Sequence, residues 1–314
     1  MTAIARVDAF APATVANLGV GFDILGLALQ EPCDIVRAEW GDKPGAVLVD
    51  IQGDNGLLPR SSEKNTATVA ANHLLKTLDA KRGVKITVYK HLPLASGMGS
   101  SAASAVAAAV AVNALFGEPL ERAQLLEACL EGEAAVSGYH ADNVAPSLFG
   151  GITLVAGTSA EQIRQLPVPQ NLHLALVTPN VAVPTAKARA ALPKEIPLKM
   201  MVAQTAGVAR LMDALYRDDL EAMASAMEAD GVVEPARAHL MPLLTEMRVV
   251  AKKAGALGLV ISGAGPTLCA VCDAEGTAER VAAAMKAGYD EAKIGATALH
   301  TTVAVEGARV IKAE

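Results

Sequence analysis

The sequence predicts an α+β fold divided into two domains, and three observations support this prediction. The chain has 314 residues, whereas a single domain usually has roughly 100 to 200. Hydrophobic residues make up 52% of the chain and charged residues 19%, a balance that supports a folded core and excludes a disordered protein. Short β-branched stretches are mixed with longer alanine- and leucine-rich stretches without strict alternation, which is typical of a layered α+β structure.

The first half of the chain is expected to contain strands and helices in mixed order. Short β-branched stretches bounded by polar residues, glycine or proline predict strands, and these lie at residues 5–11, 35–38, 47–51 and 84–89. Alanine and leucine at helical spacing, without an internal proline, predict helices at residues 66–78, 102–116 and 120–136.

A change in composition predicts the domain boundary. Residues 158–170, TSAEQIRQLPVPQ, contain two prolines and few apolar side chains, so we place the first domain at residues 1–160 and the second at residues 161–314. Within the second domain the pattern predicts strands at residues 172–176, 257–261, 267–272 and 301–305. It predicts helices at residues 201–216, 219–229, 241–254 and 278–287.

Charge and cysteine usage exclude several classes of protein. A net charge of −6 without any basic run argues against a nucleic-acid partner, which needs clustered lysine and arginine. The cysteines, Cys33, Cys129, Cys269 and Cys272, are too few and too scattered for a disulfide framework, which favours a cytoplasmic location. Cys269 and Cys272 should lie on opposite faces of a buried strand as structural thiols.

No segment of the sequence suggests a membrane partner. No apolar stretch approaches the ~18 residues that span a bilayer, and the N-terminal residues lack the uninterrupted apolar region of a signal peptide. We therefore expect a soluble protein whose partner is a small molecule. The sequence leaves the oligomeric state open, a homodimer included.

The segment Pro93–Ala103, PLASGMGSSAA, has the features of an anion site. Gly97 and Gly99 let the backbone approach a ligand closely, and Ser100 or Ser101 is expected to cap the helix that follows. Free amide N–H groups and the positive end of the helix dipole then face the loop. The segment lacks the lysine of the GxxxxGK[ST] loop, and taken alone it also fits an ordinary helix N-cap.

The whole string resembles the central motif of the GHMP kinases, PxxxG[LM]GSSAA. Two further stretches resemble motifs of that family in the expected order: Ala11–Leu29, APATVANLGVGFDILGLAL, and Ser262–Thr267, SGAGPT. The resemblance spans nearly the whole chain. It implies a ribosomal S5 domain 2-like N-terminal domain that binds ATP, a ferredoxin-like C-terminal domain, and transfer of phosphate from ATP to a small alcohol.

Two segments resemble the homoserine kinase branch of the family in particular. They are Ala11–Leu29, which has no GEH string or basic residue of the kind expected for galactokinase or mevalonate kinase, and Gly138–Gly151, GYHADNVAPSLFGG. This branch implies L-homoserine as the substrate and O-phospho-L-homoserine, on the route to threonine, as the product.

The resemblance also implies which residues bind the nucleotide. These are the residues of the loop and two polar residues near it: Pro93, Leu94, Ala95, Ser96, Gly97, Met98, Gly99, Ser100, Ser101, Ala102, Ala103, Asn65 and Lys90.

Glu133 attracts attention from the residue pattern alone. It falls at helical spacing with Leu126, Cys129, Leu130 and Val136, so it should lie on a buried stripe. A buried carboxylate needs a cation or strong donors, which leaves two interpretations: a salt bridge to an arginine, or a ligand for Mg²⁺. The resemblance implies the second, with Ser101 and Glu133 holding the metal.

The acceptor side is expected to recognise an amino acid. Arginine suits carboxylates because its guanidinium is planar and always charged, and Arg189 and Arg237 lie in segments that resemble the substrate-binding stretches of the family. Asn17 and Asp23 would then bind the amino and hydroxyl ends. The resemblance adds further residues near the reacting groups: His140, Asp142, Gly263 and Thr185, the last of which also reads as a helix N-cap.

Asp142 has two possible tasks in this scheme, to take the proton of the acceptor hydroxyl or only to orient that hydroxyl. A loose phosphoryl-transfer transition state places little early demand on the attacking oxygen, which favours orientation. Three other functions stay in view: a GHMP kinase for another small alcohol, an inactive family member that acts as a sensor, and a nucleic-acid module that shares part of the fold. The acidic charge opposes the third.

Overall fold

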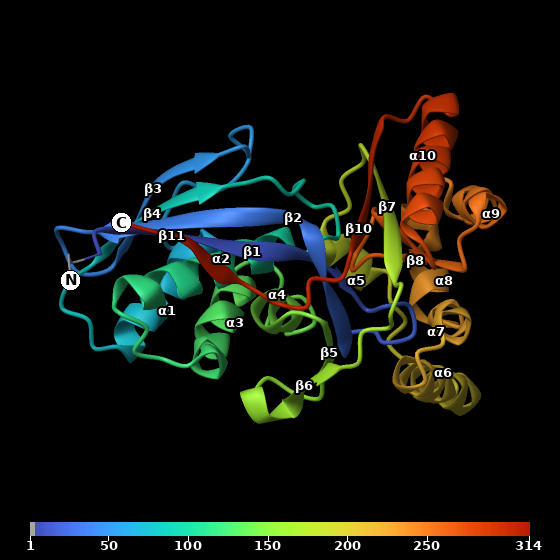
Figure 1. Ribbon diagram of the computed structural model, residues 1–314, viewed down its shortest axis with the longest axis horizontal. Helices are drawn as coiled ribbons and strands as arrows, with labels where there is room; N and C mark the ends of the chain where they lie inside the picture. Colours follow the sequence, from blue (N-terminus) through green and yellow to red (C-terminus); the bar gives the residue numbers. More distant parts are fainter. Residues whose placement is uncertain (1–3) are drawn as a thin grey trace.

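Two β-sheets organise residues 4–314, which are the residues that the computed structural model describes. Each sheet carries its own helices, and the two units lie side by side along the long axis of the molecule (Figure 1). The mixed α+β architecture predicted from the sequence is confirmed.

The first sheet has seven strands, with the order β11-β1-β2-β4-β3 and with β5 and β6 added beside β2. Strands β3 and β4 pair in parallel, and the other neighbours pair antiparallel. The strands are β1 (Arg6–Ala16), β2 (Leu25–Trp40), β3 (Ala46–Gln52), β4 (Val84–Tyr89), β5 (Ile152–Val155), β6 (Ile163–Leu166) and β11 (Arg309–Ala313).

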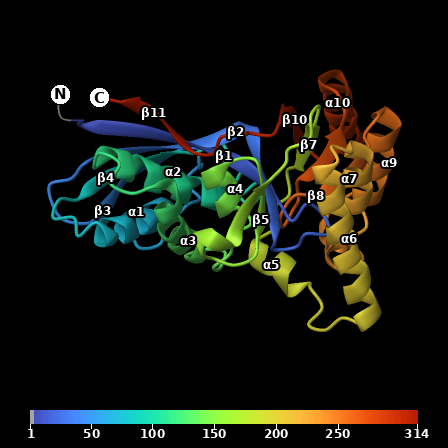
Figure 2. The same ribbon diagram turned by 60° about the horizontal axis from the view of Figure 1, so that its bottom comes forward.

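Helices gather on one face of this sheet, as Figures 1 and 2 show. They are α1 (Thr66–Thr77), α2 (Ser100–Leu115), α3 (Leu126–Ala134) and α4 (Val144–Phe149), with the short 3₁₀ helices η1 (Arg122–Leu125) and η2 (Ala160–Gln162). Helix α2 contacts β1, β2, α1 and α3 and is buried almost all round. Its run of alanine and valine explains this position, because a helix without a polar face has to be surrounded by protein.

The second sheet has the strand order β10-β7-β9-β8. Counted along the chain this is the order 4-1-3-2, and helices follow the first and third strands, which is the ferredoxin-like arrangement expected from the resemblance. The strands are β7 (His173–Pro179), β8 (Gly258–Ile261), β9 (Leu268–Cys272) and β10 (Ala296–Thr302). The helices are α5 (Thr185–Ala190), α6 (Leu198–Tyr216), α7 (Leu220–Met227), α8 (Val233–Arg237), η3 (Ala238–Leu240), α9 (Leu244–Ala254) and α10 (Glu275–Glu291).

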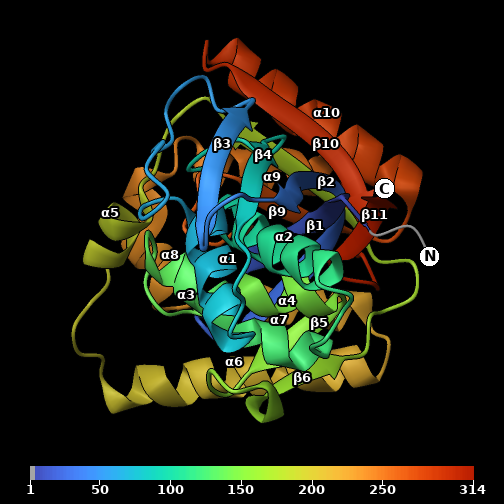
Figure 3. The same cartoon turned by 90° about the vertical axis from the view of Figure 1, so that its left-hand side faces the viewer.

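The two faces of this sheet belong to two different hydrophobic cores. Helices α9 and α10 cover one face, where Cys272 is buried, and α6 and α7 contribute to the other core, which contains Cys269. The prediction that these two free thiols point to opposite faces is therefore confirmed. Figure 3 shows α10 and α6 at opposite margins of the molecule.

The C-terminal segment returns to the first sheet. Strand β11 pairs with β1, Ala5 N donates to Glu314 O over 2.6 Å, and Arg6 forms an ion pair with Glu314. Both ends of the chain consequently lie at the same end of the molecule (Figure 1). The second sheet is thus inserted between β6 and β11 of the first.

The sequence located most elements but missed three strands of the first sheet and the short helices α4 and α8. Strands β5, β6 and β11 were not expected, because each is only four or five residues long and β6 and β11 expose much of their surface. Strand β10 spans residues 296–302 rather than the predicted 301–305. The polar residues in this strand weaken the hydrophobic pattern from which a strand is predicted. The domain boundary between residues 160 and 161 stays a prediction. Strand pairing shows in addition that β6 and β11 belong to the first sheet.

No helix within residues 4–314 combines the length and the apolar composition needed to cross a membrane.

Candidate active site

A cavity of about 570 Å³ brings together residues from both units. Among the residues predicted from the sequence, Pro93, Met98, Ala102 and Ala103 do not line it, and the last three are buried in the core. All the others do: Asn17, Asp23, Asn65, Lys90, Leu94, Ala95, Ser96, Gly97, Gly99, Ser100, Ser101, Glu133, His140, Asp142, Thr185, Arg189, Arg237 and Gly263.

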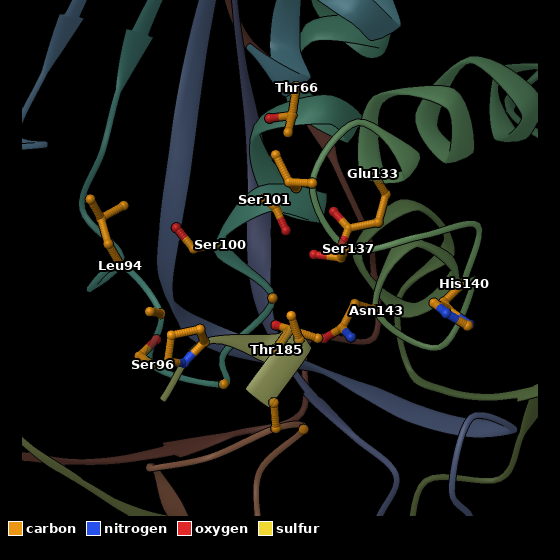
Figure 4. Close-up of a pocket in the computed structure, with 18 of the residues that line it drawn as sticks. Thr66, Leu94, Ser96, Ser100, Ser101, Glu133, Ser137, His140, Asn143 and Thr185 are labelled. Carbon is orange, nitrogen blue, oxygen red and sulfur yellow. The ribbon is translucent and has the colours of Figure 1, made fainter. Parts of the chain in front are cut away.

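The glycine-rich loop enters α2 through a left-handed residue. Gly97 and Gly99 have φ of 81° and 65°, a region that glycine adopts without strain. Gly99 is the N-cap of α2, and no side chain of the described residues caps the helix. The expectation that Ser100 or Ser101 caps it is therefore wrong: the helix begins at Ser100, so both serines lie in its first turn and line the cavity (Figure 4).

The two glycines of the loop are also required by close packing. A Cβ on Gly97 would lie 2.3 Å from the carbonyl oxygen of Ser262, and a Cβ on Gly99 would lie 2.0 Å from Thr14 Oγ1. The loop is thus clamped between β1 and the turn that joins β8 to β9. A larger residue at either position would push the loop out of place.

The loop has the electrostatic character of an anion site. The amide N–H groups of residues 94–99 donate to no backbone carbonyl within residues 4–314, and the loop precedes the N-terminus of a 16-residue helix. Free N–H groups and the positive end of a helix dipole favour phosphate.

Glu133 is buried beside this loop, with 5% of its surface exposed. Burial raises the pKa of its carboxyl group, and hydrogen bonds from Ser101 and Ser137 lower it in part. Figure 4 shows the three side chains pointing toward one another. No arginine within residues 4–314 forms a salt bridge with Glu133. The structure therefore does not support the interpretation that Glu133 is buried as the partner of an arginine.

The buried stripe ends earlier than the spacing predicted. Leu126, Cys129, Leu130 and Glu133 are buried as expected, but Val136 is 53% exposed. The physical reason is that α3 ends at Ala134, so helical spacing no longer applies to Val136.

The surroundings of Glu133 fit a magnesium ion. Glu133 Oε2 and Ser100 Oγ are buried and have no hydrogen-bond partner among residues 4–314. Leaving a buried polar atom without a partner is costly unless a ligand supplies one. No cluster of three or more His, Cys, Asp or Glu side chains suited to a metal occurs in residues 4–314. Mg²⁺ does not need one, because it commonly takes one or two carboxylates together with phosphate oxygens and water.

Asp23 and Arg189 form an ion pair at the other end of the cavity. Arg189 Nη1 donates to Asp23 Oδ2 over 2.9 Å and Nη2 donates to Oδ1 over 3.0 Å. Asn17 shapes the turn that presents Asp23: its Oδ1 accepts from Asp23 N over 3.0 Å and its Nδ2 donates to Gly263 O over 2.9 Å. The Asn17 amide is therefore already engaged in the protein.

Arg237 is a buried guanidinium without a carboxylate partner among residues 4–314. Its Nε donates to Ala188 O over 3.1 Å and its Nη1 to Gly263 O over 3.0 Å. Arg237 and Arg189 both lie against the Phe22 ring, at 5.1 and 5.5 Å from its centroid. Burial and the neighbouring Arg189 lower the pKa of Arg237, so this corner favours an incoming anion.

Asp142 is buried between the two ends of the cavity. Burial raises its pKa to about 7, and the negative charges of Asp23 and Glu133 add to the effect. Its neighbour His140 has Nδ1 4.0 Å from Asp23 Oδ2, and burial followed by Arg189 lowers the pKa of this imidazole. A carboxyl group with a pKa near neutrality can exchange a proton at physiological pH.

The shifted pKa of Asp142 predicts an unusual pH dependence of stability. Between pH 3.8 and about 7 the folded protein holds a proton that the unfolded chain has released, so the free energy of unfolding falls as pH rises through this range, by at most about 4 kcal/mol. Asp142→Asn removes this loss. In thermal unfolding, the melting temperature of the variant minus that of the wild type should therefore increase by several degrees between pH 5 and pH 8. A difference in melting temperature that does not change with pH would contradict the raised pKa of Asp142.

Lys90 and Asn65 have structural partners as well as a place in the lining. Lys90 forms a buried ion pair with Asp34 and donates to Ser100 O over 2.8 Å and to Ser104 Oγ over 2.9 Å. The Asn65 side chain caps α1 by accepting from the amides of the next turn. Contact of either residue with a nucleotide stays a prediction.

Thr185 lies one position inside the helix that it was expected to cap. Pro184 is the N-cap of α5, and Thr185 is the first helical residue. A proline with φ of −58° is already set for a helix start, which explains the shift. Thr185 still lines the cavity, as does Asn143 (Figure 4).

Sequence reasoning missed several residues of the lining. Asn143 accepts a hydrogen bond from Thr14 Oγ1 over 2.7 Å, Ser137 contacts Glu133, and Phe22 lies beneath the two arginines. Phe22 and Asn143 belong to the two segments that resembled the family, which was the available signal. Ser137 follows the end of α3 and carried none.

The fold and the cavity define the class of protein, a two-domain small-molecule kinase. Residues 65–151 match the GHMP kinases N terminal domain, and residues 211–291 match the GHMP kinases C terminal domain. A homoserine kinase of Chloroherpeton thalassium is 38% identical over 98% of this chain and 99% of its own. A homoserine kinase of Arabidopsis thaliana is 43% identical over 86% of this chain and 74% of its own.

Solved structures agree with these sequence relatives. The crystal structure of a homoserine kinase from Cytophaga hutchinsonii has a TM-score of 0.93 and 42% identity, and the match covers 98% of this chain and 97% of that one. A mevalonate kinase of L. major in complex with R-mevalonate shares the fold, with a TM-score of 0.74 and 20% identity over 94% and 95% of the chains. The chain belongs to the GHMP kinase family, in its homoserine kinase branch.

Proposed function

We propose that the protein is an ATP-dependent homoserine kinase, which forms O-phospho-L-homoserine and ADP on the route to threonine. Relatives named homoserine kinase match nearly the whole chain. The observation that carries the proposal is one cavity with a phosphate-type loop at one end and paired acidic and basic groups at the other. This polarity suits a triphosphate facing a zwitterionic alcohol. The cytoplasmic location stays a prediction.

ATP is placed with its phosphates on the loop. The free N–H groups and the start of α2 bind the negative oxygens, and the base lies among the apolar residues of the same cavity: Leu57, Leu58, Pro59 and Val88. Magnesium bound with the nucleotide would be held by Ser101 and Glu133 and would neutralise charge on the transferred phosphoryl group.

Homoserine is placed at the Asp23 and Arg189 end. Its ammonium group pairs with Asp23, and its carboxylate pairs with Arg189 and Arg237. A zwitterion replaces each partner of the existing Asp23–Arg189 ion pair with a charge of the same sign, so binding does not leave either group unpaired. Arg237 has no carboxylate partner within the described range, residues 4–314, which supports its place at the substrate carboxylate.

Asp142 then lies beside the acceptor hydroxyl. With a pKa of about 7, it is largely ionised at pH 8 and can accept the hydroxyl proton as the oxygen attacks the phosphorus. Most of the remaining rate enhancement comes from position, because phosphoryl transfer requires the attacking and leaving oxygens in line.

A coupled assay of ADP release tests the substrate class. We expect turnover with L-homoserine to exceed that with serine, threonine, mevalonate and galactose by at least about 10²-fold. Mevalonate and galactose have no ammonium group to pair with Asp23. Serine and threonine carry both charges, but their hydroxyl lies one carbon closer to these charges and is out of position for in-line attack. Preferred turnover of mevalonate or galactose would support a GHMP kinase for another alcohol. Absence of turnover with every alcohol would support the inactive sensor.

Arg237→Lys and Arg189→Lys should each raise the KM for homoserine by about tenfold to 10²-fold, with the KM for ATP nearly unchanged. Lysine keeps the charge but loses the planar fork that binds a carboxylate in bidentate fashion. Steady-state kinetics with each substrate varied in turn provide the measurement.

A matched substitution at a surface arginine controls for general effects. Arg217 has 67% of its side chain exposed and forms an exposed pair with Asp213, so Arg217→Lys should leave both KM values unchanged. Homoserine methyl ester has no carboxylate, so its KM should be nearly the same in Arg237→Lys as in the wild type. A rise confined to the KM for ATP would place the arginines on the nucleotide side.

A further inference from the structure

Three consecutive carbonyl oxygens of the phosphate loop accept hydrogen bonds from donors outside the loop. Ser96 O accepts from Thr267 N over 3.1 Å and Met98 O accepts from Thr14 N over 3.1 Å. Gly97 O accepts from Ser262 Oγ over 2.8 Å. The loop amides, in contrast, have no such backbone partners within residues 4–314. Other parts of the protein therefore hold these carbonyl oxygens, whereas the amide N–H groups of the loop remain available to bind an anion.

Holding a carbonyl also sets the direction of the next amide. In a trans peptide the C=O of one residue and the N–H of the following residue point in opposite directions. Ser262 therefore fixes the direction of the Met98 N–H, and Thr267 N fixes that of the Gly97 N–H. Without these bonds a peptide plane beside glycine turns easily, because glycine adopts positive and negative φ about equally.

Two of these donors come from the second unit. Ser262 and Thr267 bound the turn between β8 and β9 and are fully buried. The turn is itself rigidly held: Ser262 N donates to Thr267 O over 2.9 Å, and Gly265 N donates to Ser262 O over 2.8 Å. The hydroxyl that reaches Gly97 is therefore presented by a fixed backbone, from a position 165 residues away in the chain.

The same turn touches the acceptor end of the cavity. Gly263, next to Ser262, accepts from Asn17 Nδ2 and from Arg237 Nη1 through its carbonyl oxygen. One short turn of the second unit thus contacts both the phosphate loop and the proposed carboxylate site. Ser262 Oγ supplies a side-chain hydrogen bond from the turn to the loop, whereas the bond from Thr267 N to Ser96 O joins two backbone groups.

We propose that Ser262 is a positioning residue for the nucleotide, acting through the carbonyl of Gly97 to hold the loop so that Gly97 and Gly99 stay in the cavity lining where phosphate binds. This inference rests on the proposed function in that it takes ATP as the phosphoryl donor. Ser262 contacts the loop and not the reacting atoms, so its removal should weaken nucleotide binding and leave homoserine recognition intact.

Calorimetric titration with ADP in magnesium chloride tests the proposal without any turnover. Ser262→Ala should bind ADP about tenfold more weakly than the wild type, because one buried carbonyl loses its partner and the loop loses its fixed orientation. In kinetics the same variant should raise the KM for ATP by a similar factor, with the KM for homoserine changed less than twofold.

Thr178→Val provides the matched control. Thr178 Oγ1 and Thr267 Oγ1 share a buried hydrogen bond of 2.7 Å in the same sheet, so the variant removes a comparable bond that does not reach the loop. Wild-type ADP affinity in Thr178→Val, together with the loss in Ser262→Ala, supports the proposal. An equal loss in both variants, or ADP affinity within twofold of the wild type in Ser262→Ala, overturns it.

Ser262→Cys decides the matter if Ser262→Ala does not fold. Cysteine keeps the size of the side chain but is a weak donor, so ADP should bind several-fold more weakly, and wild-type affinity would overturn the proposal. If the wild-type protein itself does not bind ADP, the proposed function fails and this inference with it. Tight binding by the wild type and by all three variants removes this inference alone.

Discussion

Glu133→Gln should lower kcat by about 10²-fold or more and raise the magnesium concentration needed for half-maximal activity. The Glu133 carboxylate lies beside the phosphate loop, and one of its oxygens has no hydrogen-bond partner in the part of the chain that the structure describes. Glutamine removes the negative charge that a hard cation requires, and loss of one electrostatic contact to a developing charge typically costs this much. Turnover measured across a magnesium titration provides the test.

The variant should remain folded, which makes the kinetic loss interpretable. Burial raises the pKa of Glu133, so the site already disfavours the charged form, and neutral glutamine should not destabilise the free protein. Glu127→Gln on the same helix is the matched control, since 71% of that side chain is exposed. Normal turnover of Glu133→Gln at ordinary magnesium concentrations would remove Glu133 from the metal site.

Asp142→Asn should lower kcat by about 10²- to 10³-fold with little change in the KM for homoserine. The sequence favoured an orienting role for Asp142, but the structure adds a buried carboxyl group whose pKa is about 7, which suits a proton acceptor near neutral pH. Asparagine can still orient a hydroxyl through its carbonyl oxygen, yet it cannot take the proton.

The pH profile separates the two roles of Asp142. If the ionised carboxylate accepts the proton, kcat/KM of the wild type should rise with pH through about 7, because the protonated form is inactive. This acidic limb should disappear in Asp142→Asn. A loss of less than about tenfold, shared between kcat and KM and with the limb retained, would instead assign Asp142 to orientation only.

Local patterns in the sequence were sufficient to identify the parts of the site. The glycine and serine residues of the loop predicted an anion site, because free amides and a helix start follow from a few neighbouring residues. The spacing around Glu133 predicted a buried carboxylate, and the structure confirms it. Cys269 and Cys272 are an odd number of residues apart, which predicted that they lie on opposite faces of a strand. This prediction also depends only on neighbouring residues, because successive side chains of a strand alternate between its two faces.

The first and last residues of the helices were predicted less accurately, because neighbouring residues compete for the capping position. Gly99 rather than a serine caps α2, and Pro184 rather than Thr185 caps α5. In both cases a residue with a suitable φ precedes the hydroxyl residue and starts the helix one position earlier than the polar side chain suggests. The exposed Val136 shows the same limit at the end of α3.

The sequence by itself determined the fold class, the chemistry of the candidate residues and the family that they resemble. Only the tertiary structure decided which of them meet. Asp23 and Arg189 are 166 residues apart in the chain, β11 returns to β1 across the whole chain, and the pKa of Asp142 depends on charges brought from Asp23 and Glu133. Periodicity and turn chemistry act over a few residues, whereas these contacts and the loss of solvent around them arise when distant segments pack together.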